Sequence, residues 1–525
     1  MVVRPRLVNR LAQAGRVTMI SAPAGSGKTY LLRSWIGEAG LERSTAWVRV
    51  NREEGDANRF WNSVRSALQD TVPGSISKLN VTGTRDRDDL TVERLLMDLT
   101  ALDEPLWLVI DDLDELRSPE TLGHLELFLS RAPAQLRVAL ATRHDLRLGL
   151  HRARLDGELT ELRADDLRFT VAEAGDLFDM AGVTVPDSAL TLLVERTEGW
   201  AAGLRMAALA LAGHEDPDRF AAQFSGTYRG IADYLMAEVL ERQPKEVRSL
   251  LLRTSILEEI SAPLADRLME RIGSQRILQD LEDTNAFVTS VDASRSSFRV
   301  HPLFAELLRL ELRRTAPEEV GALHRTAATW LASRGRAIEA VEHAQASEEW
   351  ELAAHILFDQ WYDLLLSGRI AIAYELLAGF PNDRVDSDPE LALLFAARAL
   401  NEGSLDDAER LLTLAGQRPE PIDRTRRAQL SVMLALQGMC LARRRGDVRS
   451  VLERSGQLAT LIDVTAPTET TRRHELRTMS LLMLGIARLW CGEVQRAEDD
   501  LGLCRGFGRI RQVNVPEDAG FGMFR

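Results

Sequence analysis

A short glycine-containing stretch near the amino terminus carries the residue types that bind phosphate. Residues 21–30 read Ser-Ala-Pro-Ala-Gly-Ser-Gly-Lys-Thr-Tyr, the motif of a phosphate-binding loop with Ala22 in the first glycine position. In such a loop, backbone N–H groups close around phosphate oxygens, Lys28 reaches the β- and γ-phosphates, and the Thr29 hydroxyl binds Mg²⁺. The residues predicted to contact nucleotide here are Ala22, Pro23, Ala24, Gly25, Ser26, Gly27, Lys28, Thr29 and Tyr30.

Two adjacent carboxylates follow an apolar run about eighty residues further along. Leu106–Ile110 has the composition of a buried strand, and Asp111 and Asp112 come directly after it, at the edge where ligands bind in open α/β sheets. We predict that Asp111 holds Mg²⁺, through water, and that Asp112 orients or deprotonates the attacking water. The alternative for the loop is an ordinary turn that contains Gly-Lys-Thr, and carboxylates at this spacing argue against it.

An arginine ends a third apolar run. Arg143 follows Val138–Thr142 and is expected at the same edge of the sheet, where it could sense the γ-phosphate. From the residues alone, a surface arginine after a strand is an equal alternative.

Short apolar runs alternate with helical patterns through residues 1–165, which is typical of a parallel sheet built from βα units. The stretch Val72–Asp89 is rich in Gly, Ser, Thr and Asp and is predicted to be a surface loop. The predicted strands are Arg16–Ile20, Thr45–Val50, Leu106–Ile110 and Arg137–Thr142, and the predicted helices are Lys28–Gly37, Ala57–Leu68, Val92–Leu102 and Pro119–Ser130.

Two smaller domains are predicted next. Residues 166–228 are predicted to form a helical lid, in which Thr170 and Glu173 make a capping box before the first helix. Trp200 is expected to be a packing residue rather than one that stacks on a ligand, with a position near the nucleotide base as the alternative. Residues 229–315 read as four helices followed by a β-hairpin and a further helix, the pattern of a winged-helix domain. His301 lies at the junction of the hairpin and that helix, where a lone histidine is usually a cap or packing residue.

The remaining residues, 316–525, read as all helix with a repeat. Glycines recur 33, 35, 43 and 46 residues apart, and a small or apolar residue follows each by five positions. This pattern predicts stacked helix pairs close to a tetratricopeptide-like solenoid, with a plain helical bundle as the weaker alternative. The pattern fades from Leu501 onward. The glycines are Gly335, Gly368, Gly403, Gly446 and Gly492, and the residues that follow them are Ala340, Ala373, Ala408, Val451 and Ala497.

Composition limits the classes of function. A formal net charge of −14 over 525 residues disfavours nucleic-acid binding by the chain as a whole. No apolar run reaches the ~18 residues of a membrane span, and the amino terminus lacks the apolar core of a signal peptide. Three cysteines without metal-ligand spacing favour a reduced, cytoplasmic protein.

Taken in order, these motifs resemble the signal-transduction ATPases with numerous domains, and within them the large ATP-binding LuxR-family regulators of the MalT-like class. The resemblance covers nearly the whole chain. It is carried by Arg4–Leu7, Ser21–Thr29, Val109–Asp112, Leu140–Arg143, Glu161–Phe169, Thr197–Leu204 and Leu252–Leu257.

The resemblance implies a multidomain fold: a P-loop NTPase parallel sheet, a helical lid, a winged helix and a tetratricopeptide-like α-solenoid. It implies ATP and ADP as ligands, with Mg²⁺, and makes Arg143 the sensor arginine. His301 is implied to touch the β-phosphate of ADP, although Pro302 stands where the immunity and apoptosis relatives have aspartate. It further implies an inducer on the helical repeats, self-association in the ATP state and DNA contact only through a carboxy-terminal LuxR module, which these 525 residues lack.

Three functions follow as hypotheses. The first is an ATP-dependent switch of a transcriptional regulator, in which slow hydrolysis serves as a reset. The second is a non-DNA-binding interaction or scaffold protein of the same ATPase class, and a promoter-DNA retardation assay separates it from the first. A metabolic kinase is disfavoured, because the repeats occupy the place of an acceptor-substrate domain.

Overall fold

The structure is a computed structural model, and it describes residues 2–50, 57–72, 88–102, 104–116, 118–146, 148–212, 214, 216–417, 424–465 and 470–508. Its contacts divide the chain into one unit of residues 1–317 and a second of residues 318–525. Most of the predicted loop Val72–Asp89 and residues 509–525 lie outside the described residues. Within the described residues, every helix is too short or too polar to span a bilayer.

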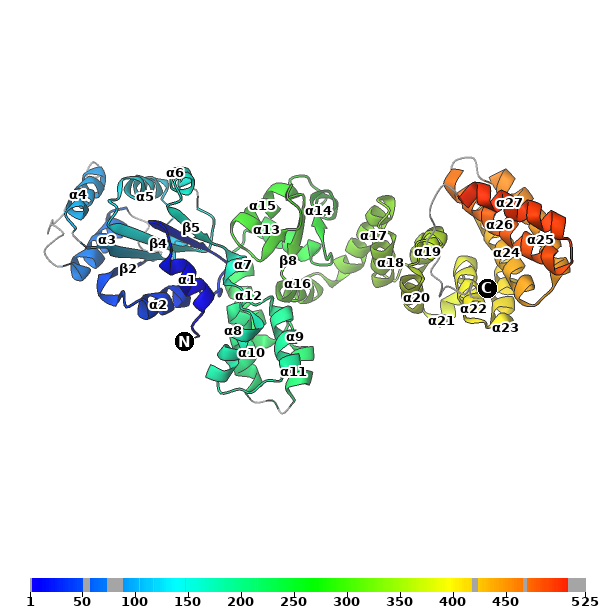
Figure 1. The fold of residues 1–525 in the computed structure, drawn as a ribbon, viewed down its shortest axis with the longest axis horizontal. Coiled ribbons are helices and arrows are strands. Elements are labelled where there is room, and N and C mark those ends of the chain that lie inside the picture. The colour runs from blue at the N-terminus through cyan, green and yellow to red at the C-terminus, as the bar shows by residue number, and fades with distance from the viewer. Residues whose placement is uncertain are drawn as a thin grey trace. The chain divides into compact units, whose positions relative to one another are not determined.

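A five-stranded parallel sheet forms the centre of the first domain (Figure 1), in the order β2-β3-β4-β1-β5. Because β3, β4 and β1 are neighbours, their carboxyl ends bring the phosphate loop, Asp111 and Arg143 to one edge. The strands are β1 (Val17–Ser21), β2 (Thr45–Arg49), β3 (Leu106–Asp111), β4 (Leu136–Thr142) and β5 (Leu159–Leu162). The four predicted strands agree within one residue, and β5 was not predicted.

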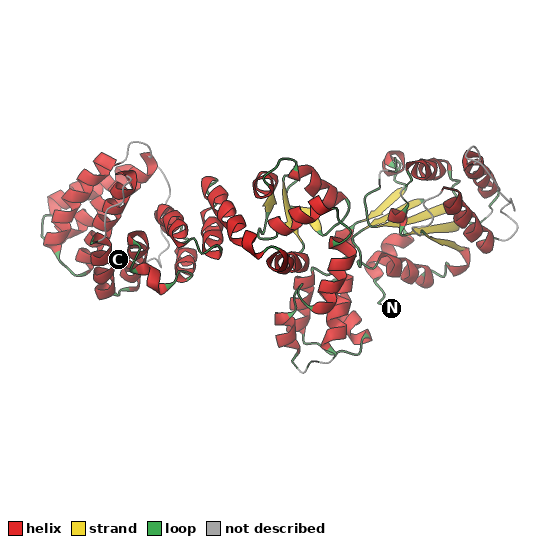
Figure 2. Ribbon diagram, turned by 180° about the vertical axis from the view of Figure 1, so that it is seen from behind, coloured by secondary structure: helices red, strands yellow, loops and turns green. Residues whose placement is uncertain are grey.

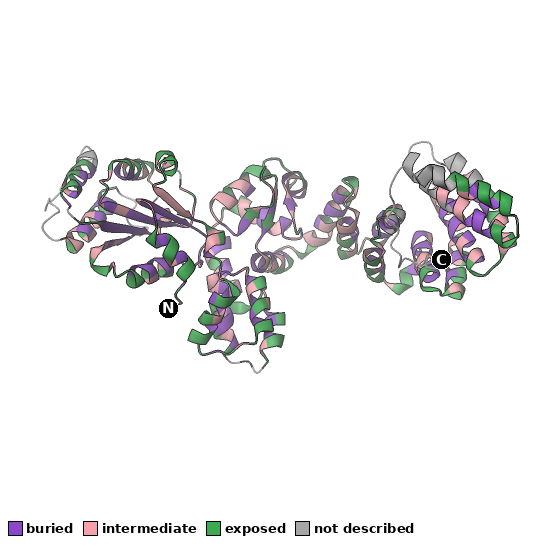
Figure 3. Ribbon diagram, in the orientation of Figure 1, coloured by how far each residue is buried: buried purple, intermediate pink, exposed green. Residues whose placement is uncertain are grey.

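Helices cover both faces of this sheet and bury β1, β3 and β4 almost completely (Figure 3). Strand β3 alternates between the two faces, with Leu108 and Ile110 in one core and Trp107 and Val109 in the other. The helices of this domain are α1 (Pro5–Ala12), α2 (Lys28–Glu38), α3 (Ala57–Thr71), α4 (Asp88–Thr100), α5 (Pro119–Arg131) and α6 (His151–Leu155), with 3₁₀ turns η1 (Glu42–Ser44) and η4 (Leu113–Glu115).

A cluster of helices follows the sheet. The predicted capping box is present: Thr170 accepts from the Glu173 N–H, and Glu173 accepts from the Thr170 N–H. Glu173 also pairs with the buried Arg4, 2.9 Å away, which ties the start of α1 to this cluster. The helices are α7 (Ala164–Leu167), α8 (Val171–Met180), α9 (Asp187–Thr197), α10 (Ala201–Leu211) and α11 (Pro217–Gln223).

A winged helix completes the first unit, and its small antiparallel sheet has the order β6-β8-β7 (Figure 2). The predicted hairpin is present, and Asp292 holds its turn by accepting from the N–H groups of Ser296 and Ser297. The elements are α12 (Arg229–Leu235), the π-helix η5 (Met236–Leu240), α13 (Lys245–Thr254), β6 (Ile260–Ser261), α14 (Ala262–Met269), α15 (Ser274–Asp283), β7 (Val288–Ser290), β8 (Ser297–Val300) and α16 (Pro302–Thr315).

The second unit is helical throughout its described residues. All five repeat glycines adopt left-handed φ angles, between 73° and 89°, and the five small or apolar residues that follow them are fully buried. The turn and packing roles predicted from the repeat therefore hold. The helices are α17 (Pro317–Ser333), α18 (Ala337–Ala346), α19 (Trp350–Leu366), α20 (Ile370–Ala378), α21 (Asn382–Val385), α22 (Pro389–Glu402), α23 (Leu405–Gly416), α24 (Arg424–Arg444), α25 (Val448–Thr465), α26 (Thr470–Trp490) and α27 (Val494–Gly508).

Candidate nucleotide-binding site

The phosphate loop joins β1 to the first turn of α2. Gly25 and Gly27 have φ angles of 74° and 85°, a left-handed backbone that other residues adopt only with strain. Gly27 is the N-cap of α2, so the unpaired N–H groups of the helix start face the loop. This arrangement suits a phosphate group. Tyr30, in contrast, is 67% exposed.

Lys28 lies folded onto its own loop. Its Nζ donates to the carbonyl oxygens of Ala22 and Pro23, at 2.7 and 3.0 Å. Desolvation by burial lowers the pKa of Lys28 to about 8, against the opposing charges of nearby aspartates. The ammonium group is therefore held by two neutral carbonyl oxygens, which a negatively charged phosphate could replace.

Thr29 and Asp111 meet, as their predicted roles require. The Thr29 hydroxyl donates to Asp111 Oδ2 at 2.9 Å, and the Asp112 N–H donates to the other carboxylate oxygen. Burial raises the pKa of Asp111, and the bond from Thr29 partly offsets that rise. A hydroxyl and a buried carboxylate are the donors by which P-loop proteins hold Mg²⁺ beside phosphate oxygens, so these residues fit that ion.

The second carboxylate has a different partner. Asp112 has a left-handed φ of 55° and forms an ion pair of 2.8 Å with the exposed Arg49 at the end of β2. Asp114, in η4, is the carboxylate that lies beside Arg143: it accepts from the Arg143 N–H at 2.9 Å. Asp114 was not among the predicted site residues, although it belongs to the acidic stretch at the end of β3.

Arg143 reaches away from the sheet toward the winged helix. Its guanidinium donates to Glu238 at 3.0 Å and lies 3.7 Å from Asp114. Burial alone would lower the pKa of Arg143, but these carboxylates raise it, so the side chain is a fixed cation. Asn285 donates both to the Arg143 carbonyl and to the Ser21 hydroxyl, which ties the winged helix to the carboxyl ends of β4 and β1.

Residues from the helical cluster cover the phosphate loop. Trp200 Nε1 donates to the Ala24 carbonyl at 3.0 Å, and the Ala202 N–H donates to the Gly25 carbonyl at 3.0 Å. A Cβ on Gly25 would lie 2.7 Å from the Ala202 Cβ and 2.9 Å from the Tyr234 hydroxyl. The loop is therefore in contact with both the lid and the winged helix.

The side chain of Trp200 lies between His301 and the phosphate loop. Its Nε2 contacts the Thr197 carbonyl at 3.0 Å, and its ring packs against Trp200 and Phe287. Burial lowers the pKa of His301, which favours the neutral ring. Its Nδ1 is buried and has no hydrogen-bond partner in the described structure. The structure thus places His301 against Trp200, which in turn contacts Ala24.

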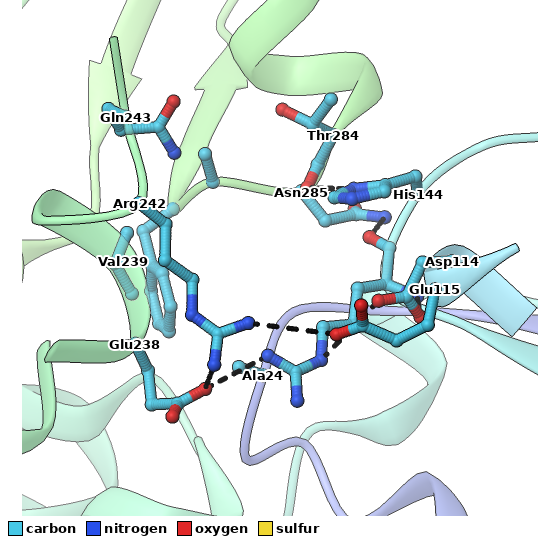
Figure 4. Close-up of a pocket in the computed structure, with 13 residues that line it drawn as sticks. Ala24, Asp114, Glu115, His144, Glu238, Val239, Arg242, Gln243, Thr284 and Asn285 are labelled. Carbon is cyan, nitrogen blue, oxygen red and sulfur yellow. Dashed lines mark hydrogen bonds and ion pairs between the residues drawn. The ribbon is translucent and has the colours of Figure 1, made fainter. Parts of the chain in front are cut away.

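A cavity of about 620 Å³ opens beside the loop, between the sheet edge and the winged helix. Figure 4 shows Asp114 and Glu115 on one side and Glu238 and Arg242 on the other, with dashed lines linking the charged groups. It is lined by Ala24, Asp114, Glu115, Arg143, His144, Glu238, Val239, Arg242, Gln243, Thr284, Asn285, Ala286 and Phe287. Most of these residues were not predicted from the sequence, because they lie far apart along the chain and come together only when it folds.

Comparisons with known proteins agree with this architecture. The family described as the MalT winged helix domain matches residues 236–320, and an AAA domain matches residues 11–149. The HTH-type transcriptional regulator MalT of Serratia proteamaculans (strain 568) is 30% identical over 446 residues, which cover 83% of this chain and 49% of that protein. The MalT regulator of Yersinia pestis (strain Pestoides F) is 28% identical over 449 residues, with the same coverage.

The chain therefore spans about half the length of the curated relatives it matches. Two solved structures are also similar. A Walker-type ATPase of Pyrococcus abyssi is 16% identical with a TM-score of 0.43, and the match covers 59% of this chain and 96% of that one. A STAND protein with a tetratricopeptide repeat sensor from Pyrococcus horikoshii is 15% identical with a TM-score of 0.34, and the match covers 97% of this chain and 77% of that one. Likenesses of this strength support no conclusion about individual residues. The predicted resemblance to MalT-like regulators and the predicted fold class are confirmed.

Proposed function

We propose that this chain is the nucleotide-dependent switch of a MalT-type transcriptional regulator. One observation carries the proposal: the phosphate loop is hydrogen-bonded to the helical lid, through Trp200 and Ala202, and Tyr234 of the winged helix lies beside Gly25 and packs on Trp200. A nucleotide that enters the loop must disturb these contacts or use them. The occupancy of the loop is therefore coupled to the positions of two further domains.

The nucleotide is ATP or ADP, with Mg²⁺. In this proposal Lys28 leaves the carbonyls of its own loop for the phosphates, and Thr29 and Asp111 hold the ion. Bound Mg²⁺ would neutralise phosphate charge. Asp112 orients the attacking water and Arg143 senses the γ-phosphate, while His301 acts on the diphosphate state through Trp200.

Hydrolysis serves as a slow reset, since the site lies among domain contacts that must rearrange. We propose that an inducer binds the helical repeats, that the triphosphate state favours self-association, and that the protein works in the cytoplasm. Contact with DNA is assigned to a carboxy-terminal module outside these residues, because the charge of −14 disfavours DNA binding by this part. The domain boundaries at residues 165, 228 and 315 belong to the same proposal.

The test replaces Lys28 with alanine and measures binding of ADP and ATP by titration calorimetry. The side chain would make charge-assisted hydrogen bonds to phosphate, so we expect affinity to fall about tenfold to a hundredfold. Lys245→Ala is the matched control, because Lys245 is exposed at the start of α13. Equal affinity for nucleotide in Lys28→Ala and the wild type would refute the proposal.

A further inference from the structure

One segment of the winged helix places three side chains over the phosphate end of the site. Tyr234, Glu238 and Arg242 are spaced four residues apart on the segment formed by α12, η5 and the turn after it. The Tyr234 hydroxyl lies beside Gly25 of the phosphate loop. Glu238 and Arg242 line the cavity and pair across it with Arg143 and Glu115 (Figure 4). This segment therefore lies beside the phosphate loop and the cavity, although it belongs to a domain outside the sheet.

Glu238 lies between two guanidinium groups. Its Oε2 atom accepts from Arg143 at 3.0 Å and from Arg242 at 2.8 Å. Arg242 extends from Glu238 toward Glu115, 4.0 Å away, and Asp114 lies on the other side of Arg143. The result is a series of alternating charges that starts at Asp114, crosses to the winged helix at Glu238 and Arg242, and returns to Glu115 in the same short turn.

The backbone at Glu238 is unusual. Met236–Leu240 is a π-helix that directly continues α12. Such bulges add a residue to a helical turn and are frequent at functional sites. Here the bulge holds Glu238 within reach of Arg143 while Tyr234 stays on the phosphate loop.

The two oxygens of the Glu238 carboxylate offer an arginine the same kind of anionic acceptor pair as two oxygens of a phosphate group. Carboxylate and phosphate are both delocalised anions that guanidinium groups bind with similar geometry. We infer that Glu238 sets the discrimination between nucleoside diphosphates and triphosphates, by holding the arginine that a γ-phosphate would have to engage. A diphosphate leaves the Arg143–Glu238 pair intact, whereas a triphosphate must replace it. This inference rests on the proposed function, in which Arg143 is the γ-phosphate sensor.

Glu238 is a specificity-determining residue in this scheme, and it touches no reacting atom. Its effect is confined to the third phosphate, because within the described part of the chain its ion pairs are with Arg143 and Arg242 and not with the phosphate loop. A purely structural ion pair would behave differently. Loss of a structural pair would loosen the domain contact and change the affinity for both nucleotides by the same factor.

The experiment measures dissociation constants of the full chain for ADP and for a non-hydrolysable ATP analogue, with Mg²⁺, for the wild type and Glu238→Gln. The amide keeps the shape of the side chain and removes its charge. The pair is about a quarter to a third exposed, so we expect the triphosphate analogue to bind about threefold to tenfold more tightly, and ADP to change by less than about twofold. Glu241→Gln, an exposed site on the same segment, should change neither constant.

Two further variants keep the test decisive. Arg143→Gln should abolish the increase in affinity for the triphosphate analogue that Glu238→Gln produces. The double variant Arg143→Gln/Glu238→Gln should therefore bind the analogue no better than Arg143→Gln alone. If Glu238→Gln does not fold, Glu238→Asp, which shortens the reach to Arg143, should shift the ratio of the two constants in the same direction. A wild type that binds neither nucleotide overturns the proposed function. A wild type that binds both, with an unchanged ratio in these variants, overturns this inference alone.

Discussion

Nucleotide affinity should fall as the pH is raised above about 8, because Lys28 must carry a proton to bind phosphate. Desolvation lowers the pKa of this buried side chain from 10.5 to about 8, with Arg143 acting in the same direction and Asp114, Asp112 and Asp111 opposing it. A bound polyphosphate adds negative charge beside the ammonium group and raises that pKa again. Binding above pH 8 therefore takes up a proton.

The size of the effect follows from that pKa. Lys28 without nucleotide is about one tenth neutral at pH 7 and about nine tenths neutral at pH 9, so the apparent dissociation constant should rise about tenfold between the two. The free energy of unfolding of the nucleotide-free chain should instead increase with pH. Between pH 8 and pH 10.5 the unfolded chain holds more protons at this site than the folded chain, so the free energy of unfolding rises with pH there.

Titration calorimetry with ADP and Mg²⁺, in two buffers of different ionisation enthalpy, measures both the affinity and the protons taken up. We expect about 0.1 proton at pH 7 and about 0.9 at pH 9. The matched variant is Lys28→Arg, since its guanidinium stays charged over this range and its affinity should show no such fall. Wild-type affinity that stays constant to pH 9 without proton uptake would refute the pKa assigned to Lys28.

Two further predictions concern the contacts around the loop. Trp200→Phe keeps the packing but removes the donor to the Ala24 carbonyl, so we expect release of a fluorescent ADP analogue to accelerate about threefold or more; an unchanged rate would show that this bond does not hold the lid on the loop. Gly226→Ala should lower the free energy of unfolding by about 1–3 kcal/mol, because its Cβ would lie 1.7 Å from the Leu303 carbonyl oxygen. The control Gly123→Ala enters open space on α5 and should leave the melting temperature equal or slightly higher, and a melt of Gly226→Ala that matches it would contradict the expected clash.

The three central strands and the edge strand β2 were predictable from sequence, and the other edge strand, β5, was not. Strands β1, β3 and β4 are buried on both faces, so their sequences are nearly continuous apolar runs. Strand β5 has the sequence Leu-Thr-Glu-Leu, and among the described residues it pairs with β1 alone. Two of the four residues of β5 are polar, so this short edge strand resembles a loop in sequence.

The same division holds at the site. The phosphate loop, Thr29 and Asp111 could be found because each follows a strand that local sequence identifies. Glu238 and Asn285 could not, because they reach Arg143 across 95 and 142 residues of chain. The π-helix that positions Glu238 departs from the period of an α-helix, and the sequence carries no signal that distinguishes the two.

Charge balance in the cavity explains why the third phosphate should matter most. Among the described residues that line it, the carboxylates of Asp114, Glu115 and Glu238 face only two guanidinium groups, those of Arg143 and Arg242. A γ-phosphate brought into this surplus of negative charge is repelled unless a cation accompanies it or a carboxylate withdraws. Asp114 is fixed by the Arg143 N–H and Glu115 belongs to the same short turn after β3. Glu238 is on a different domain and can withdraw by movement of that domain, so accommodation of a triphosphate and displacement of the winged helix become one event.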